Sequence, residues 1–396
     1  MELDRRKTSV ELGLTILLST GFLTISCARQ PSSAEDILRR YHSGDREFSG
    51  VVIKDARFKG ANLKGALLKF AKLANADLGE ANLESIDLVE AKLRNADLHG
   101  ANLKGAQLSG IDLSYANLEG AVLTEASLWH AKLTGAILKN AKLERTDLTF
   151  AKLNRAGLQQ ANLRGANLQG ADLQGVSLFG TDFTGARFER TTLIDVRLER
   201  AKLEGATFSG SIYNRETRFP EGFDIAGQYM VKVGPGMNLS NAKLSHTGLQ
   251  GVNLVNTKLM HADLSSANLK NAKLKRARLK KAMLILADLT GADLTQAVFS
   301  GANLGSANLS NANLKGAKLD HANLEYANFR GADLSGANLA NAILTKTDMR
   351  ETDLSNANLV GVSLWKTEFT GAKYNGSTVL PAGLNPGKSA MRKLDH

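Results

Sequence analysis

Residues 71–100 read AKLANADLGEANLESIDLVEAKLRNADLHG, and a large apolar residue stands at every fifth position of this stretch. The same spacing begins at Phe48 and continues without a slip to Phe208, which makes 33 consecutive repeats. Neither the 3.6-residue period of an α-helix nor the two-residue period of a strand places every fifth residue on one face. The backbone must therefore turn once in each repeat.

A second, small residue stands two positions before each large one. Of the 31 such sites from Ala56 to Ala206, 24 are Ala. If each repeat forms one short side of a coil, both residues point inward, and a narrow interior has no room for two bulky side chains per side. The other three positions face solvent and are rich in polar residues. Asp or Asn is frequent just before the central Leu, where its side chain can bond the turning backbone.

The triplets Ala76-Asp77-Leu78, Ala101-Asn102-Leu103 and Ala332-Asp333-Leu334 follow the pattern A-[DN]-L-x-x, and through it the chain resembles the pentapeptide-repeat family. The resemblance implies an all-β solenoid, a right-handed quadrilateral β-helix in which four pentapeptides close one coil. With four repeats in each coil, the chain would form two stacked segments of about eight and about seven coils, in which successive coils lie about 4.8 Å apart, the usual strand spacing.

The register defines the domain organisation. It breaks after Phe208, resumes at Leu239 and runs to Phe369 in 27 further repeats, and a pattern Y-N-x-x-T-x-x-P-x-G follows each segment. Its Pro and Gly stop the ladder, while its Tyr and Phe or Leu can cover an open coil end. Ser33 can cap a short helix over residues 34–42 that covers the first coil. We therefore assign a signal peptide or membrane anchor to 1–28, a linker and capping helix to 29–47, β-helix segment 1 to 48–212, an irregular connector to 213–238, β-helix segment 2 to 239–373, and a terminator with a basic tail to 374–396.

The amino terminus has the layout of a targeting segment. Arg5, Arg6 and Lys7 precede a mainly apolar stretch over residues 12–25, as in a secretory signal. Cys27, the only cysteine, follows this stretch and resembles the acylated first residue of a bacterial lipoprotein. Acylation of Cys27, simple cleavage and an uncleaved transmembrane helix all remain open. Because the basic flank stays in the cytoplasm, each predicts a membrane-associated, extracytoplasmic body, in the periplasm or an equivalent lumen.

The net charge is +11, which favours anionic partners. Between Asp263 and Asp288 there is no acid, and a cluster of cations fills the interval. Because five residues advance the chain by one side, these charges should wrap around the rod as a belt. The belt is either a solvated surface or a site for an anionic polymer or lipid. Its members are Lys270, Lys273, Lys275, Arg276, Arg278, Lys280 and Lys281.

Other signals favour packing over chemistry. The stretch AGLNPGKS at 382–389 fits a loose phosphate-loop pattern, but no strand and helix flank it. His261 and His321 are three coils apart, too far to share a metal ion, and His130 can stack on Phe150. Outward aromatic residues either anchor a partner or are simply scattered. They are Phe70, Tyr115, Trp129, Phe150, Phe179, Tyr326 and Trp365.

We therefore expect no enzyme, catalytic residue, cofactor, metal or small-molecule substrate. The leading hypothesis is a non-catalytic scaffold or protein-interaction module with unknown protein partners, attached to a membrane through its N-terminus. A polyanion binder that uses the 270–281 belt is the alternative. Some members of the resembled family imitate DNA and bind type II topoisomerases through an acidic rod in the cytoplasm. This chain is basic, so that function, and nucleic acid as a partner, are less expected.

Overall fold

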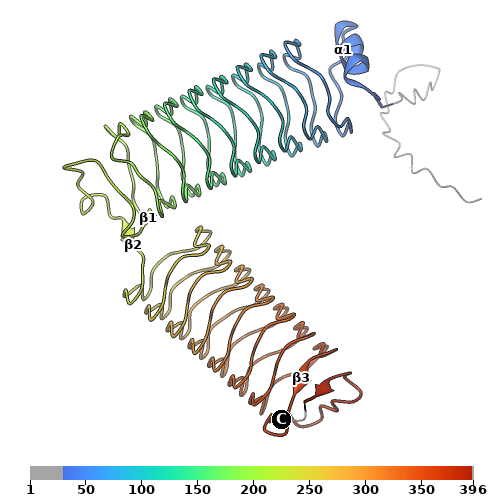
Figure 1. Ribbon diagram of the computed structural model, residues 1–396, viewed down its shortest axis with the longest axis vertical. Coiled ribbons are helices and arrows are strands. Elements are labelled where there is room, and N and C mark those ends of the chain that lie inside the picture. Colours follow the sequence, from blue (N-terminus) through green and yellow to red (C-terminus); the bar gives the residue numbers. More distant parts are fainter. Residues whose placement is uncertain (1–29, 395–396) are drawn as a thin grey trace, which may run out of the picture.

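The computed structural model describes residues 30–394, so the predicted signal, Cys27 and the anchor lie outside the described residues. From residue 47 the backbone repeats one unit per pentapeptide, a bridge residue followed by a two-residue turn. Parallel bridges join residues twenty apart, such as Lys132 and Lys152, so four pentapeptides close one coil. Figure 1 shows these coils stacked in two segments. The prediction of an all-β solenoid is confirmed.

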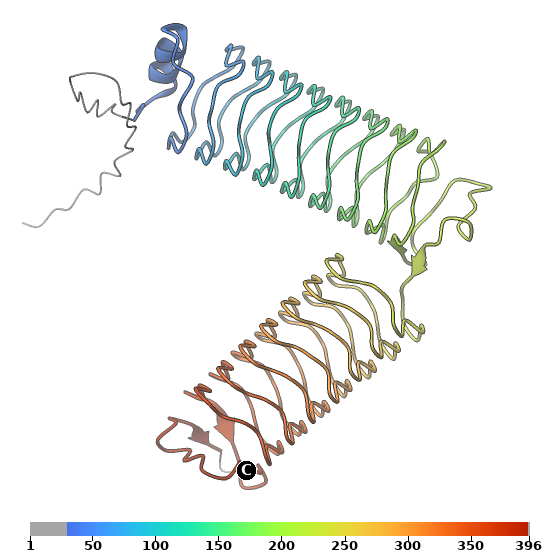
Figure 2. The same ribbon diagram turned by 180° about the vertical axis from the view of Figure 1, so that it is seen from behind.

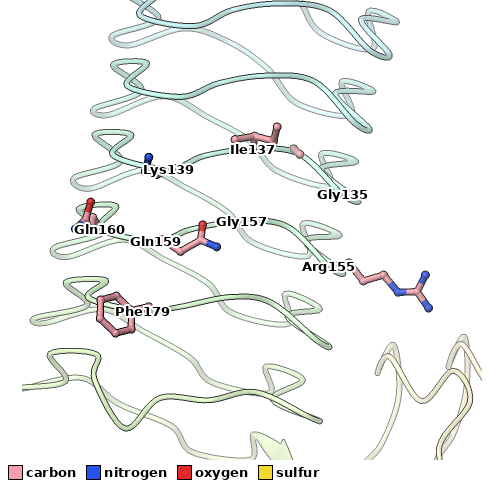
Figure 3. Close-up of a pocket in the computed structure, with 9 residues that line it drawn as sticks. Gly135, Ile137, Lys139, Arg155, Gly157, Gln159, Gln160 and Phe179 are labelled. Atoms are coloured by element: carbon pink, nitrogen blue, oxygen red, sulfur yellow. The ribbon is translucent and has the colours of Figure 1, made fainter.

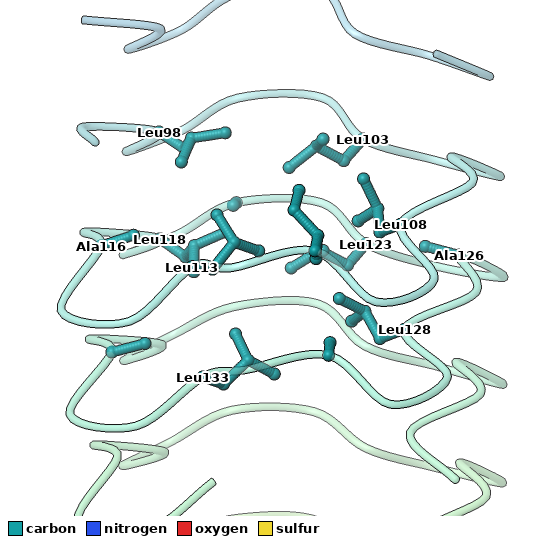
Figure 4. Close-up of a cluster of buried hydrophobic side chains, with 14 of the residues drawn as sticks. Leu98, Leu103, Leu108, Leu113, Ala116, Leu118, Leu123, Ala126, Leu128 and Leu133 are labelled. Atoms are coloured by element: carbon teal, nitrogen blue, oxygen red, sulfur yellow. The ribbon is translucent and has the colours of Figure 1, made fainter. Parts of the chain in front are cut away.

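The core is a continuous thin column of leucine and alanine. Leu118, Leu123 and Ala121 have no exposed surface, and Figure 4 shows the leucines of successive coils meeting in the interior. Full burial of one such leucine stabilises the fold by about 1.5–3 kcal/mol. Backbone bonds run between coils, from Leu123 N to Lys142 O (2.7 Å) and from Lys142 N to Ala121 O (2.9 Å). The five-residue pattern is therefore satisfied by packing and by hydrogen bonds together.

Nearly every corner of a coil contains a residue with positive φ, and Arg200 is an exception. Many are glycines, such as Gly165 at +65°, but many others are Asn, Ser, charged or aromatic residues. No Val, Ile or Thr of residues 30–394 adopts positive φ, because a branched Cβ is most strained there. As expected, the Asp or Asn before the central leucine accepts a turn N–H, as in Gly79 N to Asp77 Oδ1 (3.1 Å).

Helix α1 (Ala34–His42) covers the first coil, as the sequence predicts. The Ser33 hydroxyl accepts a bond from Asp36 N (3.1 Å) and caps the helix. Ile37 and Tyr41 are buried in the core of segment 1, and Tyr41 OH donates to Lys64 O (2.7 Å). Within residues 30–394, no helix has the length and apolar character needed to cross a membrane.

The two terminators build the same short structure. Strand β1 (Ile212–Tyr213) pairs in parallel with β2 (Val231–Lys232), and β3 (Lys373–Tyr374) pairs in the same way with β4 (Arg392–Lys393). The threonine of each motif, Thr217 or Thr378, donates to the carbonyl of a central leucine in the coil before it (2.7 and 3.0 Å). The connector at 213–238 is thus not wholly irregular, because it contains a strand pair that extends the ladder.

The two segments are not coaxial. Segment 2 leaves the end of segment 1 at a wide angle, so that the molecule forms an open V in both views (Figures 1 and 2). The end of segment 1 is covered by Phe223, whose ring packs against Phe208 (5.3 Å between centroids), so coils cannot continue there. At the vertex Gln174 Nε2 donates to Gln250 O (3.0 Å) and Gly248 N donates to Thr192 Oγ1 (3.1 Å).

The side of segment 1 that makes these contacts is called the joint face. It comprises residues 52–55, 72–75, 92–95, 112–115, 132–135, 152–155, 172–175 and 192–195, one group from each coil, aligned by the twenty-residue bridges. Because segment 2 begins against residues 172–194 of this face, the joint face lies on the inner side of the V.

Candidate anion-binding surface

The 270–281 belt lies on three successive sides of segment 2. Three neighbouring sides begin at the bridge residues 268, 273 and 278, and each of the seven cations is one of these bridge residues or lies shortly after one. Lys270 lies on the first side, Lys273, Lys275 and Arg276 on the second, and Arg278, Lys280 and Lys281 on the third. The charges therefore surround the rod and do not line one groove.

Part of the belt is neutralised by its neighbours. Lys270 Nζ lies 3.1 Å from Asp288 Oδ2. Burial opposes ionisation of Asp288, but hydrogen bonds from Thr290 and Lys270 outweigh it and hold the pKa of the carboxyl below its ordinary value. On the second side, Arg276 Nε donates to Gln296 Oε1 (2.8 Å). These two cations are engaged within the protein.

The third side carries three cations without a side-chain partner among the described residues, and the second side carries two, Lys273 and Lys275. Arg278 is bridged to Lys258 on one side and Val298 on the other, and Lys280 and Lys281 follow it at the turn. Among the described residues, none of these cations forms an ion pair. Like charges on adjacent coils raise the local positive potential, so this side of the belt is the part best suited to attract an anion.

Most of the outward aromatic residues are exposed but have a cation or another ring in contact with them. Arg94 lies over the ring of Tyr115 (4.9 Å) and Arg200 over that of Phe179 (5.1 Å). Lys346 lies over both Tyr326 (4.5 Å) and Trp365 (5.0 Å). Cation–π contacts of this kind stabilise the surface and leave less ring area for a partner. Of the seven, only Phe70 has no ring or cation partner among the described residues.

The histidines form no metal site. Within residues 30–394 there is no group of three or more ligating side chains. His130 stacks on Phe150 (5.1 Å, 20° between planes), as the sequence suggests, and Trp129 packs edge-on against His130 (4.1 Å). Burial and the neighbouring His246 lower the pKa of His130. The phosphate-loop-like stretch at 382–389 consists of turns, without the strand and helix that nucleotide binding requires.

A shallow depression of about 650 Å³ lies on the side of segment 1 that follows the joint face (Figure 3). The depression lies where Gly157, which has no side chain, stands between Ile137 and Ser177 in its column. Phe179 closes one end of it. Figure 3 also shows Arg155 at the corner, extending toward segment 2. The floor lacks a convergent set of polar groups, so the depression has the character of a surface contact and not of a small-molecule site.

The joint encloses one carboxylate. Asp172 accepts a bond from Gln174 N (3.1 Å), and its side chain occupies the space where a side chain at residue 248 would lie, so that only Gly248 fits. Burial raises the pKa of Asp172, although Asn154 and Lys152 oppose the shift. The contact was not foreseen, because neither residue departs from the repeat pattern.

One cationic feature is invisible to a search along the chain. Lys72, Lys92, Lys132 and Lys152 fall in a single bridge column of the joint face, with Asp112 between the two pairs. They do not form a cluster along the sequence, because twenty or forty residues separate each lysine from the next. Sampling every twentieth residue would have found the column.

Comparison with known proteins identifies the repeat. The family described as pentapeptide repeats matches the chain in eight copies, at residues 71–110, 101–140, 141–178, 171–210, 238–276, 262–301, 297–336 and 332–373. No curated protein sequence matches the chain.

Several solved structures are similar to parts of the chain or to most of it. HetL, a pentapeptide repeat protein involved in heterocyst differentiation regulation from the cyanobacterium Nostoc sp. strain PCC 7120, is 25% identical over 86% of this chain and 97% of its own, with a TM-score of 0.22. QnrB1, a plasmid-mediated fluoroquinolone resistance protein, is 19% identical over 46% of this chain and 87% of its own, with a TM-score of 0.35. A pentapeptide repeat protein from the Arabidopsis thaliana thylakoid lumen is 37% identical over 22% of this chain and 61% of its own, with a TM-score of 0.22. Because these scores are low, the assignment rests on the repeats themselves.

Proposed function

Because the chain belongs to the pentapeptide-repeat family, we propose that it is a non-catalytic scaffold or protein-interaction module, attached to a membrane through its N-terminus and facing outside the cytoplasm. The observation that supports this most directly is that each repeat has separate buried and outward-facing positions. Two positions are buried in the core, and the other three point outward in columns held in register by the bridges. Such a rod displays a fixed surface over its whole length.

The attachment is supported by the sequence of the first 28 residues. We propose that Cys27 is acylated after cleavage, with an uncleaved helix as the alternative form of anchor. A basic flank followed by an apolar stretch supports a position of the β-helix on the outer side of the membrane.

The test is the variant Cys27→Ala in the native host, with metabolic labelling by a palmitate analogue and fractionation of membranes. We expect the label to disappear and the protein to leave the membrane fraction, while Ser26→Thr retains both. Label on Cys27→Ala would rule out acylation at this residue. Loss of label with continued membrane association would instead establish the uncleaved anchor.

The alternative function, polyanion binding through the belt, is supported by the side that carries Arg278, Lys280 and Lys281. These charges have no ion pair among the described residues, so a multivalent anion would gain their full attraction. A topoisomerase-binding DNA mimic is not favoured, because the exposed charge is predominantly positive.

A further inference from the structure

The joint face is the cationic side of segment 1. Between residues 54 and 155 it carries seven cations and only two acids. All seven cations are exposed, and none forms an ion pair among the described residues, whereas Asp112 is partly buried and bonds to Ser114. The seven are Lys54, Lys72, Lys92, Arg94, Lys132, Lys152 and Arg155.

Cations on the other three sides of segment 1 are frequently neutralised across coils. Examples are Lys64 with Glu84 (3.0 Å), Lys139 with Glu119 (3.3 Å) and Arg145 with Glu125. These are pairs between neighbouring coils of one side, so the fold offers the same opportunity on every side. On the joint face, by contrast, none of the seven cations is paired in this way among the described residues.

The charge is arranged along a line. Lys72 is bridged to Lys92 and Lys132 to Lys152, in one column parallel to the axis of the rod. At strand spacing the column from Lys72 to Lys152 is about 19 Å long. A lysine is a mobile point charge on a flexible stem, so such a column suits anionic groups repeated along an extended chain better than one compact anion.

The V shape restricts what can reach this line. Segment 2 contacts the same face at Gln174 and Thr192 and projects away from it (Figure 1). A flat bilayer cannot lie along a face from which a second rod projects. A linear polymer can enter along the inner side of the V.

The chemistry of the two walls also distinguishes between polymers. Proteins and single-stranded nucleic acids are usually anchored by exposed aromatic rings. This face has one aromatic residue, Tyr115, which is about half exposed and has Arg94 over its ring (4.9 Å), so it offers no row of aromatic rings. The nearby wall of segment 2 presents the amides Gln250 and Asn268, which are linked to each other (2.7 Å) and can bond hydroxyl groups.

We propose that the joint face binds an extended acidic polysaccharide, one with carboxylates repeated along the chain, whose charges lie on the column from Lys72 to Lys152. This surface is separate from the belt of segment 2 and does not depend on the N-terminal attachment. The polymer is held by many weak, salt-sensitive contacts and is aligned with the rod.

The experiment uses the full chain and polygalacturonate as the probe, with binding measured at increasing NaCl. The test variant is Lys132→Gln with Lys152→Gln. The matched control, Lys104→Gln with Lys142→Gln, removes the same charge from the opposite side, where neither lysine forms an ion pair among the described residues. A second comparison, Lys280→Gln with Lys281→Gln, alters only the belt.

We expect the joint-face variant to lower affinity on the order of tenfold at low salt and both other variants to lower it less than about threefold, because close charges act far more strongly than remote ones. Circular dichroism confirms that each variant is folded, and Lys132→Arg with Lys152→Arg should retain binding. An equal loss of affinity in all three Lys→Gln variants would show that binding depends only on net charge and would overturn the proposal. A loss confined to the belt variant would assign binding to the belt. Tighter binding of oligothymidylate or of phosphatidylglycerol vesicles through the same lysines would overturn the polysaccharide as partner.

Discussion

At the corners of the coils, backbone geometry decides which residues are allowed. Nearly every corner needs a positive φ, and the chain meets this need with Gly or with unbranched side chains such as Asn, Phe or Lys. The left-handed conformation crowds the Cβ, and a second heavy atom on that carbon increases the strain. The corner therefore excludes side chains that branch at Cβ but tolerates different side-chain chemistry, which is why Phe150 and Leu286 are accepted there.

Gly165 tests this selectivity, because its φ is +65° and a Cβ there would meet only Arg145 Cγ, at a normal contact distance of 3.6 Å. Gly165→Asn should leave the free energy of unfolding nearly unchanged, while Gly165→Val should lower it by about 1–2 kcal/mol relative to Asn. Urea denaturation of the two variants measures the difference. Equal stability would show that the corner does not require this backbone conformation.

Among the elements, those with local signals were predictable and the joint was not. Helix α1 follows from Ser33 and the apolar face of residues 37–41, and the terminators follow from a motif that occurs twice. The joint depends on Gln174, Thr192 and Gly248, which are ordinary outward residues of their repeats. These residues have partners only because the fold brings the two segments together. The sequence alone therefore did not show whether the two segments stack coaxially or bend.

Asp172 gives the joint a dependence on pH. Burial raises the pKa of Asp172 in the folded state, so the folded protein favours the protonated carboxyl. The stability of the folded state is therefore highest below the ordinary pKa of about 4, and it falls as pH rises from there through the raised pKa of the folded state. The joint is therefore less stable at pH 7 than near pH 3. Asp172→Asn should therefore raise the melting temperature at pH 7, and the gain should vanish near pH 3.

Asp112→Asn is the control for this prediction, since Asp112 lies in the same column away from the joint and also accepts a turn N–H. It should change the melting temperature less at pH 7. A lower melting temperature for Asp172→Asn at pH 7 would mean that attraction to Lys152 exceeds the cost of burial.

On the scale of the whole molecule, twenty residues is the length that organises the surface. It converts four lysines scattered over eighty residues into one column and spreads a cluster of seven cations over three sides. The five-residue period was evident from the sequence, whereas the column becomes visible only when four repeats are known to form one coil. Charge that is close in sequence is thus a poor guide to charge that is close in space in this fold.

Disulfide formation between engineered cysteines tests that coil length directly. In a Cys27→Ser background, Lys142→Cys with Asn162→Cys joins a bridged pair, whereas Lys142→Cys with Gly157→Cys joins residues on different sides. Stacked strands lie about 4.8 Å apart, within the range of Cα separations that a disulfide spans. We expect rapid, nearly complete oxidation of the first pair and none of the second under mild oxidant. Oxidation of the second pair, or failure of the first in folded protein, would contradict a coil of four pentapeptides.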